Sequence, residues 1–249
     1  MKLLNKSSIR NTLLVPTCTA LLSVLLASSA VAQRSDDDSS ERKTKETVAM
    51  SQPVYEALVE AQELVEADDF QGALAKLEDM RSGRKKMSPY EQAQTWNLQA
   101  YTFYLMDDYP KSISAYENVL LQPELPEALQ QSTLKTLAQL HFTVEDYDKA
   151  LETINRLMAV ISEPAADIYM LQGQAYFQLK QFENALGPIK TAIQMNRDQG
   201  KVPRENWLLL LRVIYWEQKD FPNMLEVIKE LIQEYPKDTY VLTLAGVYS

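Results

Sequence analysis

The sequence predicts an all-α fold: a right-handed solenoid of helix–turn–helix units, with five full units followed by a half unit. Two observations predict it. One short motif recurs five times at intervals of 35 to 39 residues, and inside each copy the apolar residues follow the spacing of one helix face. A unit of this size cannot bury its apolar face alone, so successive units are expected to stack on one another.

Each copy of the motif contains an aromatic residue after an acidic or polar pair, and this residue is called the anchor below. The anchors are Phe70, Tyr109, Tyr147, Phe182 and Phe221. Three, four, seven and ten residues after each anchor stand mostly small or apolar side chains, which indicates a second helix that the anchor opens. Nine residues before the anchor the side chain is small in four copies, so that the first helix can approach the second closely: Ala61, Ala100, Ala138 and Gly173.

The ends of the predicted helices carry capping signals. Ser88 and Glu91 have the spacing of a capping box, and a proline follows Ser88 at the first helical position. Acidic pairs such as Asp107–Asp108 precede the anchors, where turn and cap residues are expected. Two residues conflict with regular packing. Arg212 replaces the small residue of the fifth copy and should loosen that unit, and Pro188 should kink or loosen a second helix.

The pattern of small and aromatic residues resembles the tetratricopeptide repeat. The closest copies are TWNLQAYTFYLMDDYPKSISAYENVL (95–120) and YMLQGQAYFQLKQFENALGPIKTAI (169–193). The resemblance implies a helical solenoid whose first helices line a concave groove that binds extended peptides or partner helices. The intervals between anchors exceed the usual 34 residues of this repeat, so helices or loops between the units must be longer.

The chain divides into three expected parts. Residues 1–32 combine a basic start with an apolar stretch and small residues, the pattern of a secretory signal peptide cleaved after Ala32. An uncleaved inner-membrane anchor is the alternative. Residues 33–52 are expected to form a disordered, charged linker, and 53–249 to form the repeat domain, truncated at its C-terminal end. The expected location is therefore the periplasm, and Cys18, the sole cysteine, leaves with the signal.

The charge of the chain disfavours nucleic acid as a partner. The formal net charge is −9, and removal of the three cations of residues 1–32 makes it −12. Such a protein repels nucleic acid and anionic lipid surfaces. We therefore expect a polypeptide partner, and membrane contact only through that partner or through an uncleaved signal.

No arrangement of residues points to catalysis, a metal or a cofactor. His141 is the sole histidine, and it occupies a position that is aromatic in other copies, where packing between helices explains it. The six glycines do not cluster into a phosphate-binding loop. The recurrent acidic pairs fit turns better than a carboxylate dyad. The expectation is a protein that is not an enzyme and holds no small-molecule cofactor.

The resemblance places the partner-binding groove on side chains five, eight and twelve residues before each anchor. The candidates are Asn97, Tyr101, Tyr104, Lys135, Gln139, Phe142, Gln174, Phe177 and Trp216. Rings would supply apolar area and amides could bond a peptide backbone. The alternative is that the rings simply pack against neighbouring helices. Chaperone-binding relatives clamp a terminal carboxylate with several Lys, Arg and Asn residues, and here only Asn97 and Lys135 stand at such positions, so that clamp is not expected.

A narrower resemblance rests on two segments, MSPYEQAQTWNLQAY (87–101) and TLKTLAQLHFTVEDYDKAL (133–151). They are similar to exported repeat proteins of Gram-negative bacteria that accompany TonB–ExbB–ExbD energy-transducing systems. The resemblance implies a periplasmic accessory of TonB-dependent uptake. The alternatives are a self-assembling structural or envelope-biogenesis protein, or the non-catalytic part of a longer enzyme.

Overall fold

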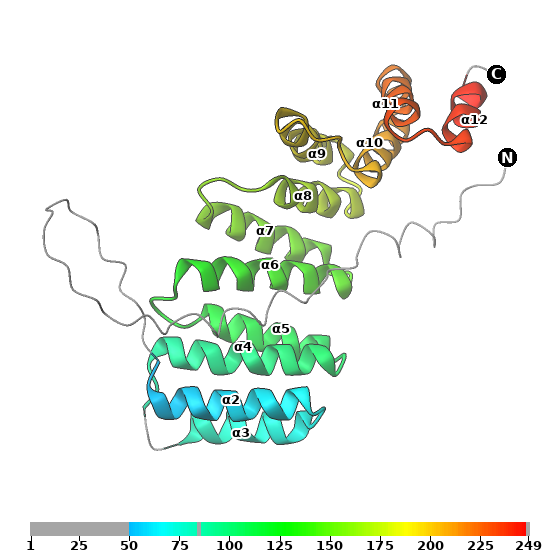
Figure 1. Cartoon of the computed structure of the whole chain (residues 1–249). Coiled ribbons are helices and arrows are strands. Elements are labelled where there is room, and N and C mark those ends of the chain that lie inside the picture. The colour runs from blue at the N-terminus through cyan, green and yellow to red at the C-terminus, as the bar shows by residue number, and fades with distance from the viewer. Residues whose placement is uncertain (1–49, 84–85, 248–249) are drawn as a thin grey trace, which may run out of the picture. The chain divides into compact units, whose positions relative to one another are not determined.

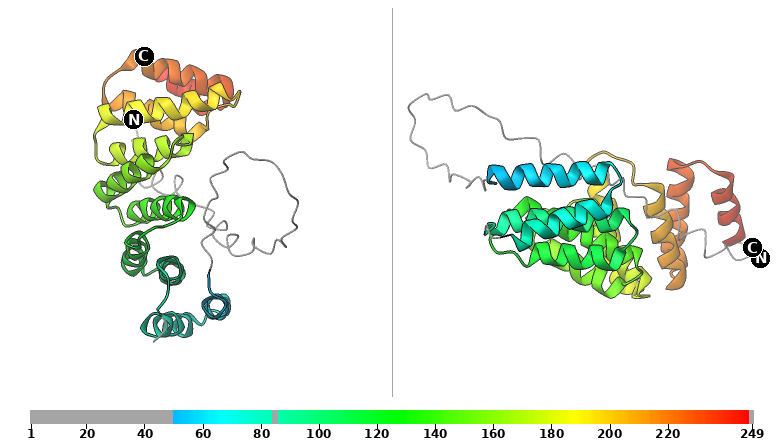
Figure 2. Two further views of the ribbon diagram at one scale, coloured as in Figure 1. Left: turned by 90° about the vertical axis from the view of Figure 1, so that its left-hand side faces the viewer. Right: turned by 90° about the horizontal axis from the view of Figure 1, so that it is seen from below.

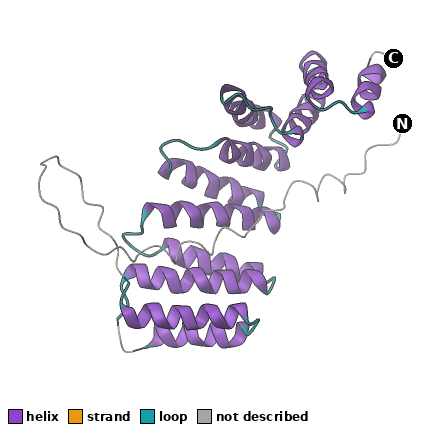
Figure 3. Ribbon diagram, in the orientation of Figure 1, coloured by secondary structure: helices purple, strands orange, loops and turns teal. Residues whose placement is uncertain are grey.

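The computed structural model describes residues 50–83 and 86–247, which belong to one compact unit that begins at Val48. Every regular element in these ranges is an α-helix, which confirms the predicted fold class (Figures 1 and 3). The expected signal peptide and residues 33–49 of the expected linker lie outside the described residues. The helices are α2 (Gln52–Glu66), α3 (Phe70–Ser82), α4 (Pro89–Leu105), α5 (Tyr109–Leu120), α6 (Glu127–Thr143), α7 (Tyr147–Val160), α8 (Ala166–Gln178), α9 (Phe182–Asp198), α10 (Glu205–Glu217), α11 (Phe221–Glu234) and α12 (Asp238–Val247).

The helices form a solenoid because each packs mainly against its neighbours in the sequence. The pairs α2–α3, α4–α5, α6–α7, α8–α9 and α10–α11 are helical hairpins, and each second helix also contacts the first helix of the next pair. Figure 2 shows these hairpins following one another, with α12 after the last. All five anchors open a second helix, as the sequence predicts. The handedness and the number of repeats stay predictions.

The same turn joins the two helices of every hairpin. The residue two before each anchor has a φ of 57–59°, a left-handed backbone conformation that is uncommon for residues other than glycine. The next residue then donates its backbone N–H to the carbonyl five residues earlier, for example Asp108 N to Phe103 O at 2.9 Å. This is a Schellman turn. In four of the five turns that next residue is an aspartate that caps the second helix, whereas Gln181 makes no side-chain cap.

Small residues let the paired helices approach closely, as predicted. Ala61, Ala100 and Ala138 are completely buried. Ser112 Oγ donates to the carbonyl of Ala100 across α4 and α5 at 2.8 Å. Gly173 lies so close to α9 that an added Cβ would stand 2.4 Å from Ile189 Cγ1. In these four hairpins the small residue nine before the anchor therefore allows the two helices to pack closely.

The two residues expected to disturb the packing, Arg212 and Pro188, lie in α10 and α9. α10 and α11 pack less extensively than α8 and α9, but so do α2 and α3, which have Ala61 at the position of Arg212, so the loosening by Arg212 stays a prediction. The Nε of Arg212 is buried and has no hydrogen-bond partner among the described residues, and burial lowers the pKa of its guanidinium. Pro188 lies inside a second helix, as expected, since α9 continues through it to Asp198, and the kink stays a prediction. Pro188 removes one backbone donor but does not end the helix.

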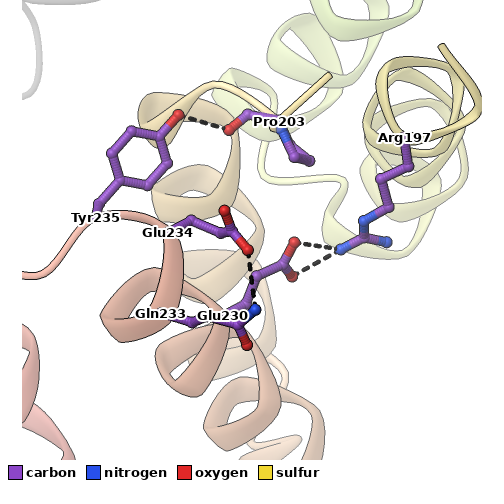
Figure 4. A network of polar contacts seen from close by, with 6 residues as sticks. All are labelled: Arg197, Pro203, Glu230, Gln233, Glu234 and Tyr235. Atoms are coloured by element: carbon purple, nitrogen blue, oxygen red, sulfur yellow. Dashed lines mark hydrogen bonds and ion pairs between the residues drawn. The ribbon is translucent and has the colours of Figure 1, made fainter. Parts of the chain in front are cut away.

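Polar contacts fasten the last helices together. Arg197 of α9 donates twice to Glu230 of α11, at 2.6 and 2.7 Å, and the Tyr235 hydroxyl donates to the carbonyl of Pro203 at 2.8 Å (Figure 4). In α12, Tyr240 is buried, and its hydroxyl donates to Glu205 of α10. Burial and this carboxylate raise the pKa of Tyr240 to about 12.

At the other end, Glu91 joins α2 to α4. Its carboxylate accepts from the backbone N–H of Ser51 at 2.8 Å, from the Ser51 hydroxyl at 2.6 Å and from the backbone N–H of Ser88 at 2.7 Å. The Ser88–Glu91 capping box is thereby confirmed. Burial alone would raise the pKa of Glu91, but these hydrogen bonds outweigh it and lower the pKa. α2 begins at Gln52, one residue before the predicted domain boundary, and Ser51 is its N-cap.

Candidate binding surface

Four hairpins carry a pair of aromatic rings at the turn between their helices. Each pair consists of the anchor and the aromatic residue five positions before it. The ring centroids are 6.1 Å apart in Tyr104–Tyr109, 5.7 Å in Phe142–Tyr147, 5.7 Å in Phe177–Phe182 and 5.8 Å in Trp216–Phe221. These eight residues are called the aromatic-pair row. The first hairpin has Val65 and Phe70 at the corresponding positions and thus no ring pair.

The turn explains why these rings meet. One ring stands in the last turn of the first helix and the other at the first position of the second helix. The Schellman turn between them reverses the chain within a few residues and brings both rings to the same end of the hairpin. The tilted and edge-to-face ring planes, at 53–74°, are the arrangements that aromatic rings prefer. The aromatic spacing in the sequence therefore has a structural cause in every pair.

The exposure of the row differs along the solenoid. Phe142 is only 4% exposed and belongs to the core between α6, α7 and α8, so its ring packs against neighbouring helices. Tyr104 and Phe177 are partly buried. In the last pair, Trp216 is 52% and Phe221 is 44% exposed. The row therefore offers its largest accessible aromatic surface on the turn between α10 and α11.

The remaining candidates lie on the first helices. Lys135 is exposed on α6, and the partly exposed polar or aromatic side chains are Asn97, Tyr101, Gln139 and Gln174. None of the nine candidates lines the cavities found beside α3–α4 and α9–α11. The structure thus places the candidate rings that stand five residues before an anchor against that anchor. The groove itself stays a prediction.

Among the cavities between successive hairpins, none of which the sequence predicted, two contain a cation next to an aromatic ring. One, of about 860 Å³, lies over α9, α10 and α11, with Leu211 and Tyr215 among its lining residues. The ammonium of Lys190 stands 5.3 Å from the centre of the Tyr215 ring at this cavity. The other, of about 550 Å³, lies between α3 and α4 beside Arg81 and Trp96. Motif spacing within one unit does not reveal cavities between units. The basic residues at 81–86 are the one feature of the sequence that points to the second cavity.

Several chemical features bear on the class of protein. His141 is buried between helices, and its Nδ1 has no hydrogen-bond partner among the described residues. Burial lowers the pKa of His141, and the negative charge of Asp146 opposes this effect. Within the described ranges, no group of His, Cys, Asp or Glu side chains could hold a metal ion. None of the helices described there is long and apolar enough to span a bilayer.

Comparison with known proteins places the fold. Residues 135–200 match the tetratricopeptide repeat family. The BBSome complex member BBS4 of Mus musculus is 24% identical over 151 residues, which are 60% of this chain and 27% of that protein. The chain therefore spans about a quarter of the length of this curated relative.

Solved structures with the same fold have low sequence identity. YrrB, a TPR protein with an unusual peptide-binding site, is 14% identical with a TM-score of 0.56, over 76% of this chain and 90% of YrrB. MamA of Desulfovibrio magneticus RS-1, from residue 41 to its end, is also 14% identical with a TM-score of 0.56, over 76% of this chain and all of that structure. This chain thus has the solenoid fold of the tetratricopeptide repeat proteins, and its residues 135–200 match their family.

Proposed function

We propose that this protein is a non-catalytic scaffold that binds a polypeptide partner on the first-helix face next to the aromatic-pair row. The observation that carries the proposal is the Trp216–Phe221 pair. These two large rings lie together at about half exposure, although apolar side chains of this size are usually more buried. Accessible aromatic rings in a pre-formed arrangement supply binding area at a small cost in side-chain entropy.

The polar side chains on the first helices fit an extended peptide. Gln139 and Gln174 are partly exposed and stand eight residues before their anchors. An amide side chain both donates and accepts, so it can bond to a peptide backbone in either direction. The peptide-binding site of YrrB, a protein of similar fold, supports this class of partner.

Site-specific photo-crosslinking in cells tests the proposal. A photoreactive residue would replace Trp216 in one variant and Gln174 in a second. Exposed Glu152, on the second helix α7, is the matched control. We expect one and the same polypeptide to be captured from Trp216 and Gln174 and to be absent from the Glu152 sample. Equal capture from all three positions, or from none, would contradict a binding surface on the first helices.

The finer proposal concerns location and partner. From the sequence resemblance, we propose that the chain is exported to the periplasm and serves TonB-dependent uptake. Its support is the signal-like pattern of residues 1–32 and the two similar segments, 87–101 and 133–151. Cell fractionation and the identity of the crosslinked polypeptide test this proposal. A cytoplasmic chain, or a partner unrelated to TonB systems, would refute it without affecting the scaffold.

Self-assembly is the second candidate function, because α12 exposes two apolar side chains. Val241 is about half exposed, and Leu242 is 71% exposed. Exposed apolar side chains that lie next to one another favour association. Light scattering over a range of protein concentrations distinguishes this candidate by the molar mass in solution. If the chain self-assembles, this mass rises with concentration and is lower in a Leu242→Ser variant. A scaffold that does not self-assemble keeps a constant mass.

A further inference from the structure

We propose that the cavity between α3 and α4 is a separate binding site for a carboxylate of an acidic peptide, with Arg81 as its main binding residue. The site goes beyond the proposed function, because it lies between the first two hairpins and includes no residue of the aromatic-pair row. Its volume of about 550 Å³ falls within the usual range of ligand cavities, about 300–1,000 Å³. The residues that line it and enter the argument are Glu78, Arg81, Lys86, Met87 and Trp96.

Arg81 is held in place but has unused hydrogen-bonding capacity. Its guanidinium carbon lies 4.0 Å from the centre of the Trp96 ring, and its side chain is only 11% exposed. Nη2 donates to Glu78 at 2.9 Å, whereas Nη1 is buried without any hydrogen-bond partner among the described residues. A buried guanidinium nitrogen without an acceptor is unfavourable and requires an explanation. Stacking on Trp96 also fixes the guanidinium plane in advance of binding.

Glu78 occupies the position that a ligand carboxylate would take. Its side chain is 69% exposed, and it stands three residues before Arg81 on the same helix, so its ion pair with Arg81 is weak. An incoming carboxylate that displaces Glu78 could accept from both Nη1 and Nη2 in the bidentate geometry that arginine favours. Binding would then satisfy the unpartnered nitrogen, which Glu78 does not reach.

The local charge favours an anionic ligand at this place. Residues 81–86 contain four basic residues and no acidic one in a chain whose net charge is −9. Of these, Arg81 and Lys86 line the cavity, and Lys86 is exposed. Elsewhere the acidic chain repels an acidic peptide, so Arg81 and Lys86 provide a specific attraction at the cavity. Met87 and Trp96 add apolar surface next to the cations, which suits the side chains of a peptide better than a bare inorganic anion.

Fluorescence polarisation with a labelled peptide tests the site. The probe is a fluorescein-labelled octapeptide of alternating Ser and Glu, and the same peptide with Gln in place of Glu is the uncharged control. Arg81→Gln should weaken binding roughly tenfold or more, because it removes a buried charge-assisted hydrogen bond. Lys86→Gln, at an exposed position, should weaken it about two- to fivefold. Glu78→Gln should tighten binding about two- to fivefold, because the competing carboxylate is gone.

Matched controls make the test decisive. Lys201→Gln has the same charge change in the exposed loop before α10 and should leave the affinity unchanged. Lys86→Gln and Glu78→Gln keep the test valid if Arg81→Gln disturbs folding. The proposal fails if the Glu peptide shows no saturable binding, if Lys201→Gln matches Lys86→Gln, or if Glu78→Gln weakens binding. It also fails if inorganic phosphate competes as strongly as the unlabelled peptide, since the site would then take a simple anion.

Discussion

Gly173 offers a direct test of how the hairpins pack. An added Cβ would stand 2.4 Å from Ile189 Cγ1 and 3.0 Å from Ile189 Cδ1, and Ile189 is completely buried. Overpacking of this kind costs about 1–3 kcal/mol. Alanine in place of glycine in a helix interior gains about 1 kcal/mol. With contacts this short, we expect Gly173→Ala to lower the free energy of unfolding by about 1–2 kcal/mol.

A double-mutant cycle assigns that loss to the contact with α9. In an Ile189→Ala background the two close Ile189 atoms are absent, and only the Ala185 carbonyl oxygen remains near the added Cβ, at 3.3 Å. Gly173→Ala should then raise the free energy of unfolding by up to about 1 kcal/mol, which gives a coupling of about 1–3 kcal/mol. Ala138→Gly, at the same position of the preceding hairpin, should lower the free energy of unfolding by about 1 kcal/mol or more, because that position already accommodates a methyl group. Urea unfolding followed by far-UV circular dichroism measures all four variants. If Gly173→Ala stabilises the protein in both backgrounds, the close approach of α8 and α9 is refuted.

Three further predictions concern the ends and the interior of the helices. The lowered pKa of buried His141 means that the unfolded chain binds a proton more readily, so stability is present above its unfolded pKa of about 6.5 and declines as the pH falls below it. His141→Phe should flatten this part of the stability–pH curve, and an unchanged slope would contradict the assignment. Gln181→Asp should supply the missing cap and raise the free energy of unfolding by about 1 kcal/mol, and Gln181→Ala should not. Glu91→Gln should lower the free energy of unfolding by about 1–3 kcal/mol at neutral pH. It should also remove the loss of stability that protonation of Glu91 causes in acid. Equal thermal unfolding of variant and parent at neutral pH would rule out the Ser51–Glu91 link.

The sequence predicted the helices well because each rests on local chemistry. The anchors, the capping box at Ser88 and the aspartates at the turns act within a few residues, and all are found where expected. Pro188 was expected inside a second helix, and α9 does run through it, because the packing of buried neighbours on both sides of the proline outweighs one missing hydrogen bond.

The binding surface could be predicted only in part. Helical spacing places Phe142 and Trp216 at equivalent positions, yet one is buried and the other half exposed. Exposure depends on which neighbouring hairpin covers a ring, and a repeat pattern does not contain that information. The stacking of Arg81 on Trp96 joins two different hairpins and escapes the repeat pattern for the same reason.

Hydroxyl-radical footprinting of the complex with the captured polypeptide tests the central claim most directly. It measures the accessibility of individual side chains with and without the partner. We predict that Trp216 and Phe177 become protected, while Tyr55, which is exposed on α2 outside the aromatic-pair row, keeps its reactivity. If Trp216 and Phe177 react equally in the free and bound protein, the partner does not bind at the aromatic-pair row, and the scaffold would have to use another face.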